Sequence, residues 1–292
     1  MAPAPRHLLL VNPSAGGGRA QGSIAEIERQ LAAAGIEHRT VLTKDLEHGV
    51  AAARSAAASG EVPVVVSGDG LIGQIGGALA GSETPLAIIP GGRGNDLARV
   101  LGIPTDIPGA VGVLAAGRIR SIDVGEANGR RFLGIASCGF DSDANRIANE
   151  AKVVKGNLVY AYAALRALVS WKPATFTLEL NGELQRTTGY TVAVCNSKAY
   201  GGGMYAAPDA ELDDGLLDIG ATGNVGKLRF LRGVAKLFKG EHFETLQVQM
   251  WRASEVRIDA DRPFAVYADG DHLTDLPATI RLLPRALRVV AP

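Results

Sequence analysis

The sequence predicts an α/β domain with a doubly wound parallel sheet, followed by a mostly antiparallel β-sandwich domain. Strand and helix patterns alternate through the first 125 residues, and short alternating strands fill most of the rest. Alternation of strand and helix is typical of a parallel sheet that is covered on both faces. We therefore divide the chain into a first domain, 1–125, and a second domain, 126–292, whose last strand can return to the first.

The first domain contains strand patterns that are each followed by a helix pattern. The expected strands are 7–12, 37–43, 62–67 and 85–90. The expected helices are 24–34, 50–58, 71–80 and 95–102, from apolar residues at helical spacing and from alanine-rich sequence. Gly102 and Pro104 end the last of these helices.

The second domain reads as short strands interrupted by helices at about 143–170 and 224–239. Two alternating runs on either side of Asn181-Gly182 predict a β-hairpin over 175–196. Further strands are expected at 215–221, 245–251, 255–259, 264–270, 278–283 and 287–290.

The composition narrows the class of protein. Lys+Arg and Asp+Glu are both 30, which argues against a general nucleic-acid binder. Cys138 and Cys195 match no metal or redox spacing, so we expect two buried thiols in a reducing cytoplasm. No signal peptide and no apolar run of about 20 residues is present, which predicts a soluble or peripheral protein.

Three turns follow predicted strands of the first domain, at 12–18, 67–70 and 90–96. The carboxyl ends of parallel strands lie along one edge, where ligands bind. Glycines allow close backbone approach, and N–H groups at the following helix starts can hold phosphate. No P-loop and no dinucleotide fingerprint is present, and glycine content alone fits ordinary strand-helix turns equally well.

The motifs NPSAGGG, SGDG, PGGRGNDLARVLGIP, DDGLLD and YADGD together resemble the diacylglycerol kinase catalytic family, which includes bacterial lipid kinases and, more distantly, sphingosine kinases and NAD kinases. The resemblance implies a nucleotide site in the first domain, a lipid site completed by the second, and ATP and Mg²⁺ as cofactors. The residues that it assigns to the nucleotide are Asn12, Ser14, Gly68, Asp69, Gly70, Gly92, Arg93, Asn95 and Asp96. Within this set, Asp69 would organise the ATP phosphates and magnesium.

The chain departs from the family pattern at several positions. Ser67 replaces a glycine, Leu71 a threonine and Gln74 a glutamate, and Arg93 replaces the threonine of the second motif. Arg93 can compensate as a charged hydrogen-bond donor to phosphate, or it can mark a site that no longer handles ATP normally. We favour compensation. For Asn95 and Asp96 a helix N-cap alone would explain the residue types; the resemblance adds a nucleotide contact for Asn95 and a charged network across the domain cleft for Asp96.

The acidic loop 208–219 matches a loop that holds a structural magnesium in bacterial relatives. The resemblance points to Asp214, with Asp213 and the carbonyl of Leu216 as helpers, and oxygen ligands suit this hard ion. A solvated acidic turn is the competing interpretation.

The turn at 268–271 offers Asp269 and Asp271, and strand alternation cannot choose between them. A hairpin turn alone would explain Asp-Gly. The resemblance assigns the catalytic base to Asp271 and a structural role to Asp269.

The segment 227–239 combines lysines and arginines with Leu228, Leu231, Val234 or Ala235, and Phe238 on one helical face. We expect this apolar face to pack on the domain core, with docking on anionic lipid as the alternative.

The sequence therefore predicts an ATP-dependent kinase of diacylglycerol or a related lipid alcohol, acting at a membrane surface. A kinase of another alcohol, such as an NAD-type substrate, and a non-catalytic lipid or nucleotide binder are the alternatives. A homodimer is compatible with the sequence, and the expected location is cytoplasmic with peripheral membrane association.

Overall fold

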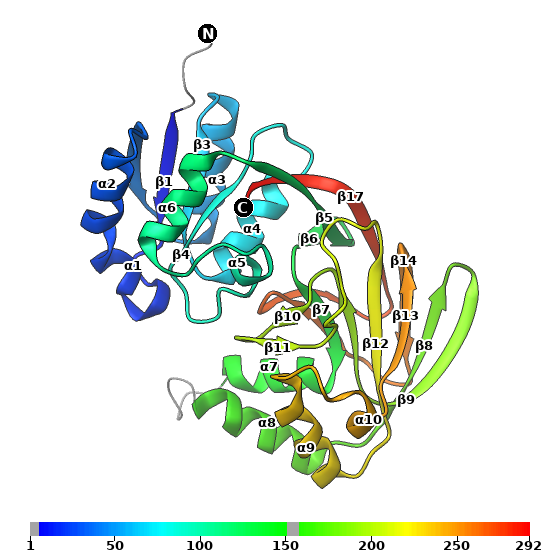
Figure 1. The fold of residues 1–292 in the computed structure, drawn as a ribbon. Helices are drawn as coiled ribbons and strands as arrows, with labels where there is room; N and C mark the ends of the chain where they lie inside the picture. Colours follow the sequence, from blue (N-terminus) through cyan, green and yellow to red (C-terminus); the bar gives the residue numbers. More distant parts are fainter. Residues whose placement is uncertain (1–5, 151–157) are drawn as a thin grey trace.

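The strands of the first domain pair in parallel in the order β2-β1-β3-β4 (Figure 1). The computed structural model describes residues 6–150 and 158–292, so the parts of the expectations above that fall on 1–5 and 151–157 lie outside the described residues. The elements of this domain are β1 (His7–Val11), the 3-10 helix η1 (Ala15–Gly17), α1 (Arg19–Gly22), α2 (Ile24–Ala33), β2 (His38–Leu42), α3 (Leu46–Ala58), β3 (Val62–Ser67), α4 (Asp69–Leu79), β4 (Ala87–Pro90), α5 (Asp96–Val100) and α6 (Ile107–Ala116).

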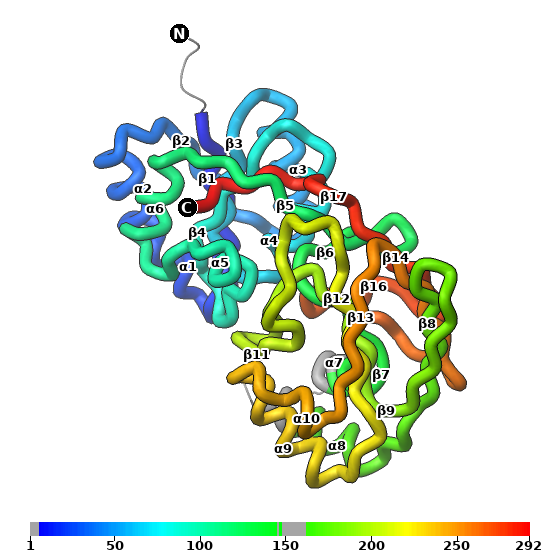
Figure 2. The backbone as a smooth tube through the Cα atoms, turned by 45° about the vertical axis from the view of Figure 1, so that its right-hand side comes forward, coloured from blue at the N-terminus to red at the C-terminus, as the bar shows by residue number. Residues whose placement is uncertain are grey.

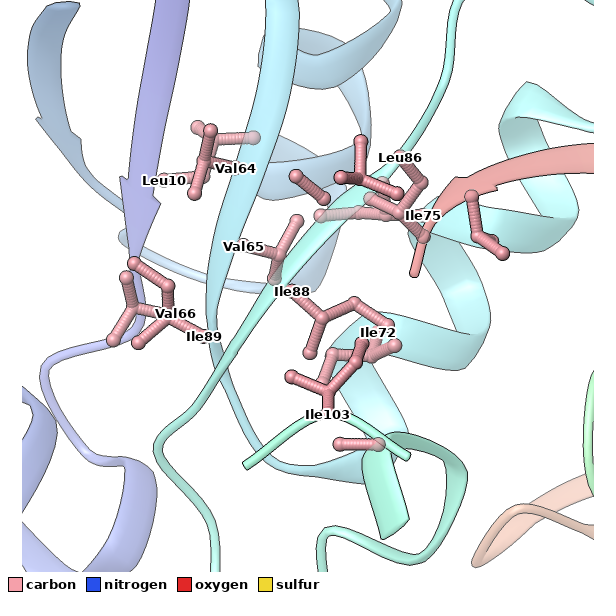
Figure 3. Close-up of a cluster of buried hydrophobic side chains, with 14 of the residues drawn as sticks. Leu10, Val64, Val65, Val66, Ile72, Ile75, Leu86, Ile88, Ile89 and Ile103 are labelled. Atoms are coloured by element: carbon pink, nitrogen blue, oxygen red, sulfur yellow. The ribbon is translucent and has the colours of Figure 1, made fainter. Parts of the chain in front are cut away.

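Helices cover both faces of this sheet, and β3 is buried along its whole length. Figure 3 shows its valines with the isoleucines of α4 and β4 in one apolar cluster. β-branched residues favour strands and pack well on the pleated surface. The sheet and α4 are therefore held together mainly by aliphatic burial.

The first domain differs from the sequence prediction at the start of one helix and in one additional helix. α3 begins at Leu46 rather than Val50, because the Asp45 carboxylate caps it by accepting from the His48 N–H at 2.8 Å. Helix α6 was not predicted, since its sequence contains Pro108 and two glycines. The Asp106 side chain accepts from the Gly109 N–H at 2.8 Å, and a proline in the first turn suits a helix start.

The second domain is an antiparallel sheet in the order β16-β15-β7-β9-β8-β14-β17-β5-β6, with β12 paired to β9 and β13. Its elements are β5 (Ile119–Ala127), β6 (Arg130–Phe132), β7 (Ile135–Gly139), α7 (Phe140–Glu150), α8 (Leu158–Ser170), β8 (Ala174–Leu180), β9 (Glu183–Cys195), β10 (Ala199–Tyr200), β11 (Met204–Tyr205), β12 (Leu217–Gly223), α9 (Lys227–Leu237), α10 (Phe243–Leu246), β13 (Gln249–Ala253), β14 (Glu255–Ala260), β15 (Ala265–Ala268), β16 (Asp271–Asp275) and β17 (Ala278–Val290). The predicted fold class is confirmed, and β8 and β9 form the hairpin predicted around Asn181-Gly182.

Strand β17 joins the two domains. Two separate strands were predicted at 278–283 and 287–290, whereas the chain forms one strand with a register shift between Leu283 and Leu287. Its second half enters the aliphatic core of the first domain, where Val289 bridges Leu86. Figure 2 shows this red segment passing from the second domain to the first.

The packing of α9 corrects the sequence analysis. The face predicted to pack on the core is exposed at Leu228, Leu231 and Phe238. The buried face carries Phe230, Gly233 and Leu237 instead, and Val234 alone of the predicted face is partly buried against the core. Phe230 stacks on the Tyr190 ring at 4.0 Å, and Gly233 lies so close to Leu246 that a side chain would overlap it. An aromatic stack and a close helix contact therefore set the rotation of α9.

Candidate active site

The loops that follow β1, β3 and β4 meet at the carboxyl edge of the parallel sheet. Asn12 donates from its side-chain amide to the Ser67 hydroxyl at 3.3 Å. The Gly91 N–H donates to the Ser67 carbonyl at 2.8 Å, and a Cβ on Gly92 would overlap Gly68. The glycines at 68 and 92 are therefore required by the contact between the second and third loops.

Other glycines leave backbone open for a ligand. A Cβ on Gly18 or Gly70 would meet no atom within 4 Å. Gly70 lies in the first turn of α4, whose N-terminal N–H groups favour anions. Ser14 is exposed, and its N–H donates to the Asn12 carboxamide oxygen at 3.1 Å.

Two arginines lie over these loops. Arg93 is exposed, and its guanidinium lies near Gly17, where a Cβ would be 3.9 Å from Nη2. Arg19, which the sequence analysis missed, donates to the Gly16 and Gly92 carbonyls at 3.1 Å each. Positive charge therefore stands next to the open glycine backbone, an arrangement that fits phosphate groups.

Asn95 holds the third loop. Its side-chain oxygen accepts from the Gly92 N–H at 2.8 Å, and its amide donates to the Gly92 carbonyl at 3.2 Å. Its backbone is left-handed, with φ of 53°, a conformation that asparagine tolerates better than most residues. In this structure its side chain therefore contacts its own loop.

Asp69 is the first residue of α4 and faces the third loop. One carboxylate oxygen accepts from the Leu97 N–H at 3.2 Å, in the first turn of α5. The other lies where a Cβ on Gly94 would approach it to 3.0 Å. The carboxylate between Gly68 and Gly70 therefore lies at the junction of the loops. A simple turn would need the glycines but would not need this carboxylate.

Asp96 connects the two domains. One oxygen accepts at 2.8 Å from the N–H of Gly202, in the turn between β10 and β11. Its other oxygen is buried and finds no hydrogen-bond partner among the described residues. Burial, with the nearby charge of Asp69 adding to it, raises the pKa of Asp96. The link across the cleft thus runs to a backbone N–H.

The turn between β15 and β16 brings Asp269 and Asp271 to the same region. Asp269 accepts from the Leu133 and Gly134 N–H groups at 2.9 and 3.1 Å. Burial, and the charge of Asp69, raise the pKa of Asp269 to about 6, although those hydrogen bonds oppose the shift. Asp271 is exposed and accepts from the Gln74 side-chain amide at 3.3 Å.

A pocket of about 380 Å³ separates α4 from β6 and the β15–β16 turn. Gly70, Gly73 and Gln74 line it on the helix side, and Asp269 and Asp271 line it on the other. A larger residue at position 73 would crowd Asp269, because a Cβ on Gly73 would lie 3.1 Å from an Asp269 oxygen. Sequence spacing gave no sign of this pairing of α4 with the turn.

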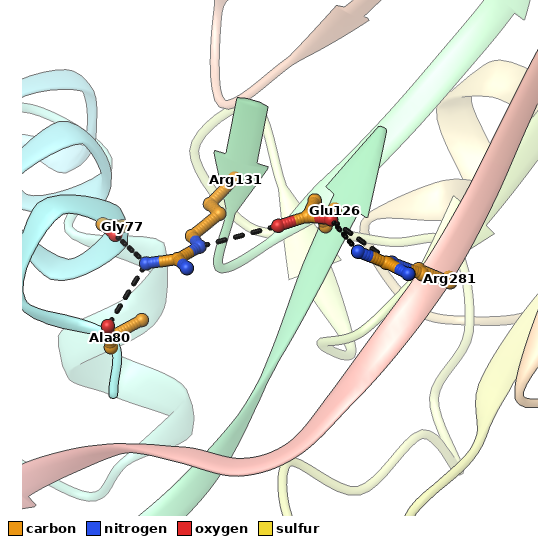
Figure 4. Close-up of polar contacts among 5 residues, drawn as sticks. All are labelled: Gly77, Ala80, Glu126, Arg131 and Arg281. Atoms are coloured by element: carbon orange, nitrogen blue, oxygen red, sulfur yellow. Dashed lines mark hydrogen bonds and ion pairs between the residues drawn. The ribbon is translucent and has the colours of Figure 1, made fainter. Parts of the chain in front are cut away.

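The position of α4 depends on a polar link to the second domain, shown in Figure 4. Arg131 donates to the Gly77 and Ala80 carbonyls at the end of α4, at 3.0 and 2.9 Å. Its Nε donates to Glu126 at 3.4 Å, and Glu126 accepts from Arg281 at 2.6 Å. Arg281, and then Arg131, lower the pKa of Glu126. Sequence reasoning missed this link because its partners lie up to 155 residues apart.

The residues expected to hold structural magnesium have arginine partners. Asp213 accepts two hydrogen bonds from Arg120, at 2.9 and 3.0 Å, and Arg120 lowers its pKa. Asp214 bonds Arg252 and accepts from the Leu216 N–H at 3.0 Å. Within 6–150 and 158–292 no group of three His, Cys, Asp or Glu side chains surrounds one point. Both carboxylates are paired with arginines in this structure, and the predicted magnesium site stays a prediction.

The α/β domain supplies glycine-rich loops that fit phosphate, and the β-domain brings carboxylates to their edge, which are the kinds of group that phosphoryl transfer uses. Residues 6–127 match the family model of the diacylglycerol kinase catalytic domain, and residues 134–291 match the YegS C-terminal NAD kinase beta sandwich-like domain. The chain belongs to the diacylglycerol kinase family, and it is a kinase whose acceptor is an alcohol group.

Relatives match over nearly the whole chain. A diacylglycerol kinase of Mycobacterium tuberculosis (strain H37Rv) is 35% identical over 295 residues, covering 97% of this chain and 94% of its own. One from Bacillus subtilis (strain 168) is 28% identical, covering 98% and 96%. The crystal structure of a candidate diacylglycerol kinase from Bacillus anthracis has a TM-score of 0.82 at 25% identity, covering 100% of this chain and 98% of that one.

In the described part of the chain, no helix is long and apolar enough to span a membrane.

Proposed function

We propose that this protein transfers the γ-phosphoryl group of ATP to the hydroxyl of diacylglycerol or a related lipid alcohol. The observation that carries the proposal is the meeting of Asp69 with the glycine-rich loops on one side and the acids of the β15–β16 turn on the other. The names of the relatives supply the substrate class. The proposed reaction uses Mg²⁺, which neutralises charge on the nucleotide when bound.

Each group of the chain has a role in this proposal. Backbone N–H groups near Gly18 and Gly70, with Arg93, bind phosphate oxygens. Asp69 orients the phosphates, and the carboxylate of Asp271 takes the proton of the lipid hydroxyl. The lipid oxygen forms a bond to the γ-phosphorus as the bond to the β-phosphate oxygen breaks, which leaves ADP and a phosphorylated lipid.

The replaced hydroxyl at position 71 fits this proposal. Leu71 is buried and packs against Gly49, where a Cβ would lie 2.9 Å from its methyl group. It therefore belongs to the α3–α4 contact, on the side of α4 away from solvent. The loss of a hydroxyl there is compatible with phosphate binding by the loops.

The test is to incubate purified protein with γ-labelled ATP, Mg²⁺ and a panel of lipid alcohols, with NAD in a separate arm. We expect label in diacylglycerol or a close relative. Asp69→Asn keeps an acceptor for the Leu97 N–H, so it should remain folded while turnover falls by about 100-fold or more. Asp271→Asn should lower turnover by about 100-fold with ATP affinity little changed.

Glu179→Gln, an exposed change on β8, is the control. Label in NAD alone would replace the lipid substrate with a nucleotide one. If no acceptor is labelled, the protein would be a non-catalytic lipid or nucleotide binder. A folded Asp69→Asn with near-normal turnover would remove Asp69 from the reaction.

A further inference from the structure

Helices α8 and α9 meet at the end of the second domain that is remote from the first domain (Figures 1 and 2). The Lys227 ammonium, at the start of α9, donates to the Val169 carbonyl at the end of α8, at 2.7 Å. The outer sides of these two helices therefore form a continuous surface, which we call the α8–α9 face.

The outer side of α8 is apolar. Leu165 is 55% exposed and Val169 is 79% exposed, and Tyr162 one turn earlier is exposed as well. The opposite side buries Ala163, Ala167 and Leu168 in the domain. A surface helix ordinarily presents polar residues to water. On α8 Tyr162, Leu165 and Val169 instead present large apolar side chains to water, next to the exposed Arg166 and Ser170.

Helix α9 continues the same surface. Leu228 is 75% exposed and Phe238, directly after the helix, is 54% exposed. The rotation fixed by Phe230 and Gly233 turns these residues outward. Contiguous exposed apolar side chains on a soluble domain indicate an interaction surface.

The charge on this face has one sign. Segment 227–239 carries five cations and no acid, in a chain whose net charge is zero; they are Lys227, Arg229, Arg232, Lys236 and Lys239. Arg166 adds a further cation on α8, whose sequence from 158 to 170 contains no acid. A partner that complements this face must offer both an apolar interior and negative charge.

We propose that the α8–α9 face docks the enzyme on an anionic phospholipid bilayer. The leucines, the valine and Phe238 enter the boundary between headgroups and acyl chains, and the surrounding cations meet the headgroups. The inference rests on the proposed function, because a diacylglycerol acceptor resides in such a bilayer. It adds the surface by which a soluble chain reaches that acceptor.

The first experiment measures vesicle binding without catalysis. Purified protein is sedimented with sucrose-loaded vesicles of phosphatidylglycerol and phosphatidylcholine, and with vesicles of phosphatidylcholine alone. We expect binding to the anionic vesicles that weakens as salt rises, because charges are screened within about 8 Å at physiological ionic strength. The variant with Leu165→Ser, Val169→Ser, Leu228→Ser and Phe238→Ser should bind about tenfold more weakly or worse.

Leu184→Ser is the matched control, because Leu184 is 70% exposed at the β8–β9 hairpin, away from this face. A charge variant, Arg232→Glu with Lys236→Glu and Lys239→Glu, avoids Arg229, which holds the Glu244 and Thr245 carbonyls. It should lose the salt-dependent part of binding, at about fivefold per cation removed at low salt. Arg257→Glu on β14 is its control. Unchanged vesicle binding in both face variants would overturn the proposal.

The second experiment separates docking from catalysis. Each variant is assayed with long-chain diacylglycerol in vesicles and with a short-chain, water-soluble diacylglycerol. Docking variants should lose activity on vesicles and keep turnover on the soluble substrate, whereas Asp69→Asn should lose both. If no lipid is phosphorylated at all, the proposed function fails. The sedimentation experiment still tests whether the α8–α9 face binds vesicles, because it does not depend on catalysis. A concentration-dependent dimer that the apolar variant abolishes, without vesicle binding, would assign the face to a second copy of the chain and overturn the proposal.

Discussion

Asp269 is a carboxyl group whose surroundings disfavour its charge. Its neighbour Asp271, two residues away, lies in solvent beside Gln74. The family resemblance separates the two acids by motif position, and their contacts separate them physically: Asp269 holds the backbone of Leu133 and Gly134, and Asp271 faces an open pocket.

The pKa of Asp269 makes stability depend on pH. Its folded pKa of about 6 lies above the ordinary value of 3.8, so its favourable contribution is complete below pH 4 and is lost as pH rises through 6. Replacing it by asparagine removes this dependence. The free energy of unfolding of Asp269→Asn should therefore rise relative to wild type by up to about 3 kcal/mol between pH 4 and pH 6.5.

Urea unfolding at several pH values measures this difference. Asp271→Asn is the control, since that side chain is exposed. A difference between Asp269→Asn and wild type that stays constant with pH would show that Asp269 is ionised normally.

Arg93 provides a second test at this scale. It stands where the family has a threonine, and it lies beside Gly17 of the first loop. If it contacts nucleotide phosphate, Arg93→Ala should raise the Michaelis constant for ATP by about tenfold, the scale of a charge-assisted hydrogen bond, with the constant for lipid changing less. Arg118→Ala, at an exposed position after α6, is the control. Unchanged ATP kinetics would exclude the contact.

At the scale of secondary-structure elements, the short hairpin of β10 and β11 links Asp96 to the core of the second domain. Gly202 at its tip holds Asp96, and the Tyr200 hydroxyl donates to an oxygen of the half-buried Asp141 at 3.0 Å. The Thr191 hydroxyl donates to the other oxygen at 3.2 Å. Burial raises the pKa of Asp141, and both hydrogen bonds oppose the shift.

Tyr200→Phe removes the hydroxyl and leaves the ring. The free energy of unfolding should fall by about 1–3 kcal/mol, the cost of an unsatisfied buried acceptor. Turnover should fall several-fold, because the hairpin positions Asp96 through Gly202. Tyr205→Phe, on the exposed strand of the same hairpin, is the control for both measurements. Equal turnover in the two variants would detach the hairpin from catalysis.

Elements differ in how far sequence pattern predicts them. The continuous apolar run at 62–67 and the alternating hairpin strands within 175–196 were predicted within one or two residues. Helix α9 was predicted with the wrong face inward, because periodicity records where apolar side chains lie and does not record the Tyr190 stack that selects among them. When a helix has apolar residues on more than one face, the elements that pack against it decide which face is buried.

At the scale of the whole molecule, the order of the two domains could be predicted from the sequence. The contacts that hold the domains together could not, because they join residues far apart in the chain. The motifs placed Asp69 and the loops at one sheet edge because strand ends in a parallel sheet must meet there. The link from Arg131 through Glu126 to Arg281 and the hold of Asp123 on Gly215 and Arg285 have no local signature. Charged residues on strands read as solvated until their partners are known.

Strand β17 has a consequence for how the chain is made. Leu86 and Val289 are bridged, so the ribosome must add about 200 residues after Leu86 before the first core can close. At about 5–20 residues per second this takes on the order of 10–40 s. During that time the nascent α/β domain lacks Leu287 and Val289, so the apolar side chains that pack against them stay exposed. Chains stalled on the ribosome short of residue 280 should be cut by protease in this domain, and chains in which residue 291 has emerged should resist.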